Sequence, residues 1–558
     1  MKQLFKHFIL SFIISCGILT TAQAQPADVV KTGKAIFSLT TFKADGSILA
    51  TTNGFFIGEN GEAISSWKPF VGATSAVVVD AEGNKRDVDV MVGANELYDV
   101  CQFRVKGTTT SSTLSTTPLK EGGKAWLVGY SVKKPKCKEY AISKVETFME
   151  KYNYYIFKDK VVENMEGCPF VNANGQVVGI MQVSKGGTEV HATDAALAKT
   201  FTVNGLTIND AVLKQTAIRV ALPEKEEDAQ LTLLMAGNKG DSIAYSQYID
   251  DFIRQFPASA EGYFSRAKVN VNANNFDAAD ADMQMAIEKA DKKDEAHSDF
   301  ATLIYLKEIY RQGIPYDKWS LQKALEEASK AYDINPLSAY EHQKAQIVYA
   351  MGNYQEAYDT FMKLTGSDLR NGELFYEAAQ CKQQLKAPQE EILQLLDSAI
   401  TVSEATGRNN AAPYYLARGQ AYDNAGEYRK AVLDYNQYDT LMYGRASHEF
   451  YYIKFKCESK IRQYQQALND IAHAIVINRR EPLYYAEMAS LQLRVKQYEN
   501  AIATCDICLQ IDPEYADPYV IKGIAQAELK QTDKAKECFL KAKELGDERA
   551  DGLLEKYK

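Results

Sequence analysis

The feature that most constrains the fold is a repeat in the C-terminal half of this 558-residue chain. Four alanines end the similar segments "EYRKA", "QYQQA", "QYENA" and "QTDKA", at separations of 36, 34 and 34 residues: Ala431, Ala467, Ala501 and Ala535. A period of this length, with helical spacing of apolar residues, is typical of stacked helix pairs. Because each pair buries its apolar face only against its neighbours, the sequence predicts an array of helices that curves around a concave surface.

The clearest copies carry small and aromatic residues at corresponding positions. "YYLARGQAYDNAGEYRKAVLDY" supplies Tyr415, Gly419, Tyr422, Gly426, Ala431 and Tyr435, and "YVIKGIAQAELKQTDKAKECFLKA" supplies Tyr519, Gly523, Ala535, Phe539 and Ala542. These stretches resemble the tetratricopeptide repeat (TPR), and looser copies extend the resemblance to about 228–545. It implies an all-α TPR superhelical solenoid of roughly eight or nine helix pairs, whose concave face binds a protein or peptide.

One class of TPR partner is disfavoured by the sequence. Repeats that bind chaperone tails carry a lysine-asparagine pattern on their first helices, and this pattern is missing here. The residue pairs at those positions are Phe264 and Lys268, His342 and Gln346, Leu416 and Gln420, Tyr452 and Lys456, Ala486 and Ser490, and Val520 and Ile524.

The N-terminal half follows a different period. From Lys34 to about Val203, short β-branched and aromatic runs such as "AIFSLTTF", "AVVVDAEGNKRDVDVMV" and "PFVNANGQVVGI" alternate with Asn-Gly and Gly-Asn turns. Alternation with such turns predicts an antiparallel, all-β domain. This pattern stops before Glu224, so the chain contains two domains of different class.

Three stretches of the β-rich half, "GFFIGENGEAISSWKPFVGA", "NELYDVCQFRV" and "NMEGCPFVNANGQVVGI", occur in this order. They resemble the segments that carry the catalytic residues of trypsin-like serine proteases, especially the Deg type. The resemblance covers about 34–203 and implies an all-β double barrel. It assigns Lys68 to the histidine position, Asp99 to the aspartate position and Glu166 to the serine position. Asn164 stands at the oxyanion glycine, where we expect it to disturb the backbone N–H donors.

The chemistry of that family requires a hydroxyl nucleophile, an imidazole base and an orienting carboxylate. Glu166 is a weak nucleophile, and Lys68 is protonated unless it is strongly desolvated. We therefore expect an inactive, protease-like domain in which Lys68, Asp99 and Glu166 converge as an ion cluster. The simpler alternative is three solvated side chains at the mouth of a groove.

Other catalytic constellations are weak. The only histidine of the β domain, His191, follows the nucleophile loop, whereas the family's histidine precedes it. Cys168 with His191 is one remaining pair, although a packed cysteine and a strand histidine explain it more simply. A dyad of Lys68 with Ser65 or Ser66 is disfavoured because these serines share its strand end. Two alternatives stay open: a peptidase with a noncanonical site, and a peptide-binding module that retains the substrate groove.

The cysteines also favour packing roles. Cys101, Cys137 and Cys168 lie in the β domain, and their odd number leaves at least one free there. The "CDIC" segment could indicate a redox or metal motif, but Cys505 and Cys508 align with packing positions of the next repeat, and a structural zinc site needs four ligands. We therefore expect no metal or cofactor.

The first residues indicate export. Two lysines, an apolar run at 8–19 and "TTAQAQ" predict a signal peptide cleaved after Ala24, and the alternative is a lipidated Cys16 in "IISCG". We expect a periplasmic or secreted, cell-surface protein with a β domain at 25–205, a linker at 206–225 and a TPR domain at 226–558. Removing 1–24 takes the formal charge from −9 to −11, which argues against nucleic acid as a partner.

Overall fold

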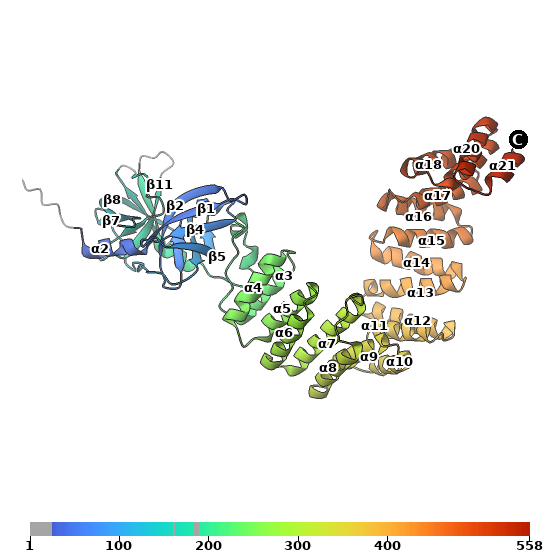
Figure 1. The fold of residues 1–558 in the computed structure, drawn as a ribbon, viewed down its shortest axis with the longest axis horizontal. Helices are drawn as coiled ribbons and strands as arrows, with labels where there is room; N and C mark the ends of the chain where they lie inside the picture. Colours follow the sequence, from blue (N-terminus) through green and yellow to red (C-terminus); the bar gives the residue numbers. More distant parts are fainter. Residues whose placement is uncertain (1–24, 160–161, 184–188, 558) are drawn as a thin grey trace, which may run out of the picture. The chain divides into compact units, whose positions relative to one another are not determined.

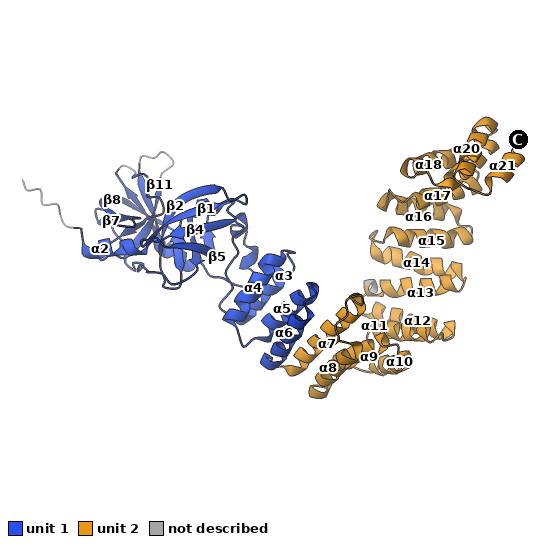
Figure 2. Cartoon of the chain, in the orientation of Figure 1, with its two compact units in different colours: residues 1–290 blue, residues 291–558 orange. Residues whose placement is uncertain are grey.

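The computed structural model describes residues 25–159, 162–183 and 189–557 (Figure 1). The predicted signal peptide at 1–24, its cleavage site and Cys16 lie outside the described residues. Internal contacts divide the chain into two compact units, 1–290 and 291–558 (Figure 2). Each unit is described by itself.

The first six strands form a closed antiparallel barrel in the order β1-β2-β3-β6-β5-β4. Along β1, alternate side chains point into the barrel, where the rings of Phe37 and Phe56 lie 4.6 Å apart. Burial of this alternate set fixes the register of the strands. The strands are β1 (Ile36–Phe42), β2 (Ile48–Phe56), β3 (Glu62–Ser65), β4 (Ser75–Val79), β5 (Lys85–Asn95) and β6 (Val100–Val105).

The next six strands form a second closed antiparallel barrel in the order β10-β11-β12-β9-β8-β7. Its core contains Tyr140, Phe157 and Phe170, and the last two rings stack 4.3 Å apart. The predicted all-β double barrel is therefore confirmed. The strands are β7 (Lys124–Gly129), β8 (Lys136–Phe148), β9 (Tyr152–Phe157), β10 (Pro169–Val171), β11 (Val177–Val183) and β12 (Val190–Asp194).

A short helix precedes the barrels. In α2 (Ala27–Thr32), Val29 is fully buried in the second barrel's core. The Thr32 hydroxyl donates a hydrogen bond of 2.7 Å to the carbonyl of Gly175, in the Asn-Gly turn between β10 and β11. The residues just after the predicted cleavage site are thus part of the second barrel's packing.

The segment expected as a linker, 206–225, packs on the first barrel. Leu213, Ile218 and Val220 belong to that barrel's buried core. Met91 on β5 donates its N–H to the carbonyl of Arg219, and Ala221 donates to the carbonyl of Met91, both at 2.8 Å. Because these backbone groups are paired, the segment extends the barrel.

The same segment attaches the first helices to the barrel. The guanidinium of Arg219 makes ion pairs with Asp89 on β5, at 3.0 Å, and with Asp251 on α4 (Ser242–Gln255). The N–H of Val220 donates to the hydroxyl of Tyr248 on the same helix. These contacts explain why the first compact unit extends to residue 290 and includes four helices beyond the predicted start of the TPR domain at 226.

Helices follow one another to the end of the described chain, which confirms the predicted repeat-like, all-α region (Figure 1). Among the described residues, no helix has both the length and the hydropathy of a membrane span. The first unit contains α3 (Glu226–Gly237), α4, α5 (Ala260–Asn272) and α6 (Phe276–Lys289). The second contains α7 (Lys293–Tyr310), α8 (Leu321–Ile334), α9 (Ser338–Ala350), α10 (Tyr354–Leu364), α11 (Gly372–Gln384), α12 (Gln389–Thr406), α13 (Ala412–Asn424), α14 (Tyr428–Met442), α15 (His448–Lys460), α16 (Tyr464–Ile477), α17 (Pro482–Arg494), α18 (Tyr498–Ile511), α19 (Ala516–Glu528), α20 (Thr532–Glu544) and α21 (Ala550–Lys556).

Small residues allow the paired helices to approach closely, as the repeat pattern predicts. A Cβ atom at Gly523 on α19 would lie 2.5 Å from the ring of Phe539 on α20, and one at Gly419 would lie 2.6 Å from Tyr435. Cys505 and Cys508 on α18 are fully buried, which confirms their predicted inward position. Alanine, glycine and cysteine here set the distance between neighbouring helices.

Replacing Gly523 with leucine should destabilise the helical region by about 1–3 kcal/mol, because the new side chain must displace Phe539. The measurement is the midpoint of urea unfolding followed by circular dichroism. Gly552→Leu on α21 is the matched control, since no atom lies within 4 Å of its added Cβ. Equal midpoints for the two variants would contradict this account of helix packing.

Thiol reactivity should follow burial. All eight described cysteines are free thiols, and Cys137 alone among them is half-buried rather than buried. Burial raises the pKa of Cys168 to about 12 and that of Cys508 to about 11, so their reactive thiolates are scarce at neutral pH. With the folded chain 25–558, a disulfide reagent should label Cys137 first, and Cys137→Ser should remove this phase. Rapid labelling of Cys505 or Cys508 would count against the packing described above.

Candidate functional site

Lys68 opens the turn η2 (Lys68–Phe70), which follows β3. Trp67 and Phe70 on either side are buried in the first barrel, and their rings stack 6.2 Å apart. The backbone of Lys68 is therefore anchored, whereas 75% of its side-chain surface is exposed.

Asp99 lies in the turn between β5 and β6, with its carboxylate 5% exposed. Its Oδ1 accepts the backbone N–H of Lys68 at 2.8 Å, and its Oδ2 lies 3.2 Å from the Lys68 amine. Oδ2 is buried and accepts no hydrogen bond from the described residues. The ion pair with Lys68 therefore compensates for the loss of water around this oxygen. Removing the positive charge would leave a buried oxygen without a partner, which is costly.

The turn that carries Asp99 is held from the second barrel. The Gln182 amide on β11 donates to the carbonyl oxygens of Tyr98 and Asp99, and the Thr193 hydroxyl on β12 donates to that of Tyr98. Asp99 itself has φ of +51°, a left-handed conformation that aspartate tolerates better than most residues. Side chains of the second barrel thus position a carboxylate of the first.

The loop before β10 carries Glu166 and is held by the end of β2. Asn53 donates its side-chain amide to the carbonyls of Asn164 and Glu166, both at 3.0 Å, and its N–H to Glu166 at 3.1 Å. The Thr52 hydroxyl also donates to the Glu166 carbonyl. A Cβ at Gly167 would lie 2.1 Å from the Asn53 carbonyl, so this position requires glycine. Four hydrogen bonds from three groups of β2 therefore fix the backbone of the loop that carries Glu166.

Asn164 occupies the conformation that a glycine would adopt. Its φ is +61°, in the left-handed region where asparagine is enriched. The N–H groups of Asn164 and Glu166 donate no hydrogen bond to any described residue. Asn164 thus has a backbone conformation that glycine would also adopt, and its effect on the N–H donors stays a prediction.

Glu166 interacts electrostatically with both other residues of the cluster. Although its side chain is accessible, the surrounding atoms displace enough water to raise the pKa of its carboxyl. The negative charge of Asp99 raises this pKa further, and the positive charge of Lys68 lowers it. The structure thus brings Lys68 and Asp99 into contact, with Glu166 within electrostatic range of both.

The other candidate catalytic pairs are not assembled. His191 directs its Nδ1 to the hydroxyl of Tyr154 at 2.7 Å, and Cys168 is fully buried, with its pKa raised to about 12. Ser65 donates to the carbonyl of Asn53, and the Ser66 hydroxyl is buried without a partner among the described residues. Neither serine contacts Lys68, whose amine faces Asp99 instead.

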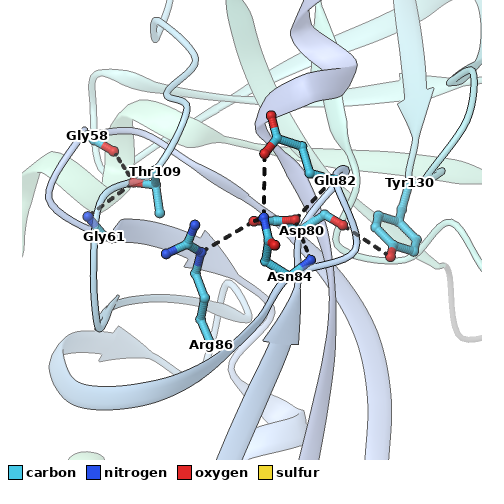
Figure 3. Close-up of polar contacts among 8 residues, drawn as sticks. All are labelled: Gly58, Gly61, Asp80, Glu82, Asn84, Arg86, Thr109 and Tyr130. Carbon is cyan, nitrogen blue, oxygen red and sulfur yellow. Dashed lines mark hydrogen bonds and ion pairs between the residues drawn. The ribbon is translucent and has the colours of Figure 1, made fainter.

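A second polar network braces the barrels (Figure 3). Burial alone would raise the pKa of Asp80, but hydrogen bonds from Asn84, Glu82 and Arg86 lower it below its usual value. The hydroxyl of Tyr130, after β7, donates to the Asp80 carbonyl at 3.3 Å. Donors of its own hairpin thus occupy the Asp80 carboxylate. The hydrogen bond from Tyr130 makes the same turn a structural contact between the two barrels.

The connection between β6 and β7 is fixed close to this second polar network (Figure 3). The hydroxyl of Thr109 donates to the carbonyl of Gly58 at 2.7 Å and accepts the N–H of Gly61 at 3.1 Å (Figure 3). These bonds attach the connection between β6 and β7 to the turn between β2 and β3.

Several positioning residues were missed from the sequence. Asn53 and Gly54 form an Asn-Gly pair that is typical of a hairpin turn, yet both lie within β2. Gln182 and Thr193 belong to no motif, because their role arises only when the second barrel lies against the 98–99 turn. Gln182 and Thr193 can be identified as positioning residues only once the three-dimensional positions of the strands are known.

Two comparisons with known proteins gave matches. A family model described as tetratricopeptide repeat matches residues 516–545, which contain all of α19 and α20. The chain is also similar to the crystal structure of a protease from M. tuberculosis in its active form, with a TM-score of 0.29 and 14% identity. That similarity covers 36% of this chain and 86% of the protease. Two closed six-stranded antiparallel barrels are, by their topology, like the trypsin-like protease fold.

The electrostatic cluster predicts opposite effects of two substitutions on Glu166. Lys68→Met should raise the pKa of the Glu166 carboxyl, and Asp99→Asn should lower it, because each change removes one charge that acts on this group. Asparagine retains the acceptor for the Lys68 N–H. The measurement is the pH titration of the ¹³C-labelled carboxyl of Glu166. Lys124→Met, which removes a lysine paired with Glu139 on β8, is the control and should leave this pKa unchanged.

Proposed function

We propose that this protein is an exported interaction protein. In it, a trypsin-like β domain without peptidase activity is joined to helices of the tetratricopeptide type that hold a protein partner. The observation that carries the proposal is the ion pair between Lys68 and Asp99. The carboxylate that would orient an imidazole instead compensates an ammonium, and an ammonium cannot take a proton from a nucleophile.

The nucleophile position supports the same conclusion. Glu166 carries a carboxylate in place of a hydroxyl, and its pKa is raised through burial and Asp99. Asn164 and Gly167 of the same loop both adopt left-handed conformations. The lack of a hydroxyl at position 166 supports the proposed absence of peptidase activity.

The helical half supports a protein partner. The tetratricopeptide repeat match at 516–545 and the paired helices around it belong to an architecture that presents extended binding surfaces. Location outside the cytoplasm, in the periplasm or at the cell surface, is proposed from the sequence of residues 1–24, and cell fractionation of the tagged full chain tests it.

A second candidate function is a peptide-binding β domain that retains its groove. The observation that favours it is the exposure of the Lys68 amine and the Glu166 side chain at the same site. Opposite charges side by side could hold the polar groups of a bound peptide without cleaving it. Binding of unfolded casein that is weakened by Lys68→Met would support this candidate.

Catalysis is tested directly by turnover of an activated ester and of casein. The wild type should match a Glu166→Ala control, and a serine-directed covalent probe should label neither protein. Lys68→His with Glu166→Ser restores an imidazole and a hydroxyl and should give weak esterase activity. The reason is that losing such groups typically costs several orders of magnitude in rate. Since the backbone at Asn164 is already left-handed, adding Asn164→Gly should change this activity little.

Wild-type turnover that disappears in Glu166→Ala would show that Glu166 is catalytic. The active peptidase with a noncanonical site would then replace the proposal.

A further inference from the structure

We infer that a pocket between α11, α12 and α13 binds an extended, uncharged segment of a partner protein through its peptide groups. The inference rests on the proposed function of the helices as a protein-binding surface. It adds the place of binding and the chemical character of the bound segment.

The pocket has a volume of about 270 Å³ and lies wholly within the second compact unit. Side-chain amides from two neighbouring helices line it, Gln380 and Gln383 from α11 and Gln420 and Asn424 from α13. An apolar wall that includes Leu396 of α12 completes it. The cavity is near the lower end of the range for ligand sites, so it suits one or two residues of a chain.

The lining is neutral, although the protein has an ordinary share of charged residues. Asp, Glu, Lys and Arg make up 25% of the chain, but none of them lines this pocket. Two basic residues that lie next to the lining in sequence are paired with carboxylates: Lys382 with Glu391 at 2.8 Å, and Arg418 with Asp397 and Asp434. A charged ligand group would find no counter-ion here and would lose its hydration, which is unfavourable.

The four amides are free to bind. The side chains of Gln380, Gln383, Gln420 and Asn424 make no hydrogen bond with any described residue. By contrast, Gln389 at the start of α12 donates to the carbonyl of Ala421, at 3.4 Å, and so joins α12 to α13. The unpartnered amides are therefore grouped in the lining of one cavity.

A primary amide matches a peptide group, because each has one C=O acceptor and N–H donors. A glutamine can therefore pair with the N–H and C=O of an extended chain at the same time. The apolar wall of Ile392, Leu396 and Ala417 then accommodates a small aliphatic side chain. This combination favours an extended segment with uncharged polar and small aliphatic residues.

A neutral saccharide shares the hydrogen-bonding chemistry but fits less well. Sugar rings commonly stack on a free aromatic face, and the only aromatic residue of the lining is Tyr376. Its ring packs against that of Tyr414, with centroids 5.6 Å apart. The remaining wall is aliphatic, which suits a side chain better than a pyranose.

The pocket coincides with an irregularity of the array. From the start of α11 to the start of α13 the chain runs 40 residues, whereas from α17 to α19 it runs 34. Part of this extra length comes from α12, which has 18 residues, whereas α18 has 14. From α9 onward, the repeat that begins at α11 is the longest, and it contains the neutral cavity.

The test uses the full chain 25–558 and an array of peptides of about twelve residues. One set contains only uncharged residues, and the matched set has Lys or Glu at every third position. The wild type should retain uncharged peptides preferentially, with affinities measured by fluorescence anisotropy. Gln383→Leu with Gln420→Leu should weaken their binding by about tenfold to a hundredfold, because the peptide groups lose two amide partners.

Two further variants distinguish a specific loss of binding from misfolding. Gln394→Leu with Gln465→Leu replaces exposed amides outside the pocket and should leave binding unchanged. Gln420→Glu should shift selection towards lysine-containing peptides, a gain that an unfolded protein cannot produce. Absence of this shift, together with unchanged binding by the double leucine variant, would overturn the inference.

The outcomes separate this inference from the proposed function. If the array peptides bind all pocket variants as well as the wild type, the pocket is refuted, but the proposed protein-binding solenoid is not. Retention of no peptide and no partner from envelope extract would refute both. Binding of maltooligosaccharides that is lost in the double leucine variant would overturn the peptide assignment in favour of a saccharide site.

Discussion

The β domain depends on one buried carboxylate. Asp99 sits in a turn whose carbonyl oxygens are held by Gln182 and Thr193 of the second barrel, while its own oxygens face the N–H and amine of Lys68 in the first. A buried carboxylate is stable only if it is hydrogen-bonded or paired. The same turn therefore carries both a contact between the barrels and a carboxylate that is paired with the ammonium of Lys68.

The helical region uses its polar groups differently. On α13, Arg418 is engaged by two carboxylates, whereas Gln420, two residues later, has no partner among the described residues and lines the neutral cavity. Paired charges contribute to the stability of neighbouring helices, while unpaired amides remain available to a ligand. The two regions thus differ in how they use polar groups: the β domain pairs a lysine with a buried carboxylate, and the helical region leaves neutral amides unpaired around a cavity.

Much of the fold could be predicted because periodicity is local. The alternation along β1 and the 34-residue spacing of the alanines each follow from which face of an element is buried, and a sequence records that directly. The segment 206–225 was harder, because Ile218 and Val220 are buried through contact with distant strands and have no pattern of their own. The conformation of Asn164 likewise depends on Asn53, over a hundred residues earlier in the chain.

By itself, the sequence determined the two classes of domain and the residue types at positions 68, 99 and 166, because composition and order are written in the chain. Only the tertiary structure decided that the Lys68 amine compensates a buried Asp99 and that four amides line a cavity without charges. It also decided that loss of water, together with the charge of Asp99, raises the pKa of the Glu166 carboxyl, against the opposing charge of Lys68. The physical reason is that burial and electrostatic energy depend on distances between residues remote in sequence, and those distances exist only once the chain has folded.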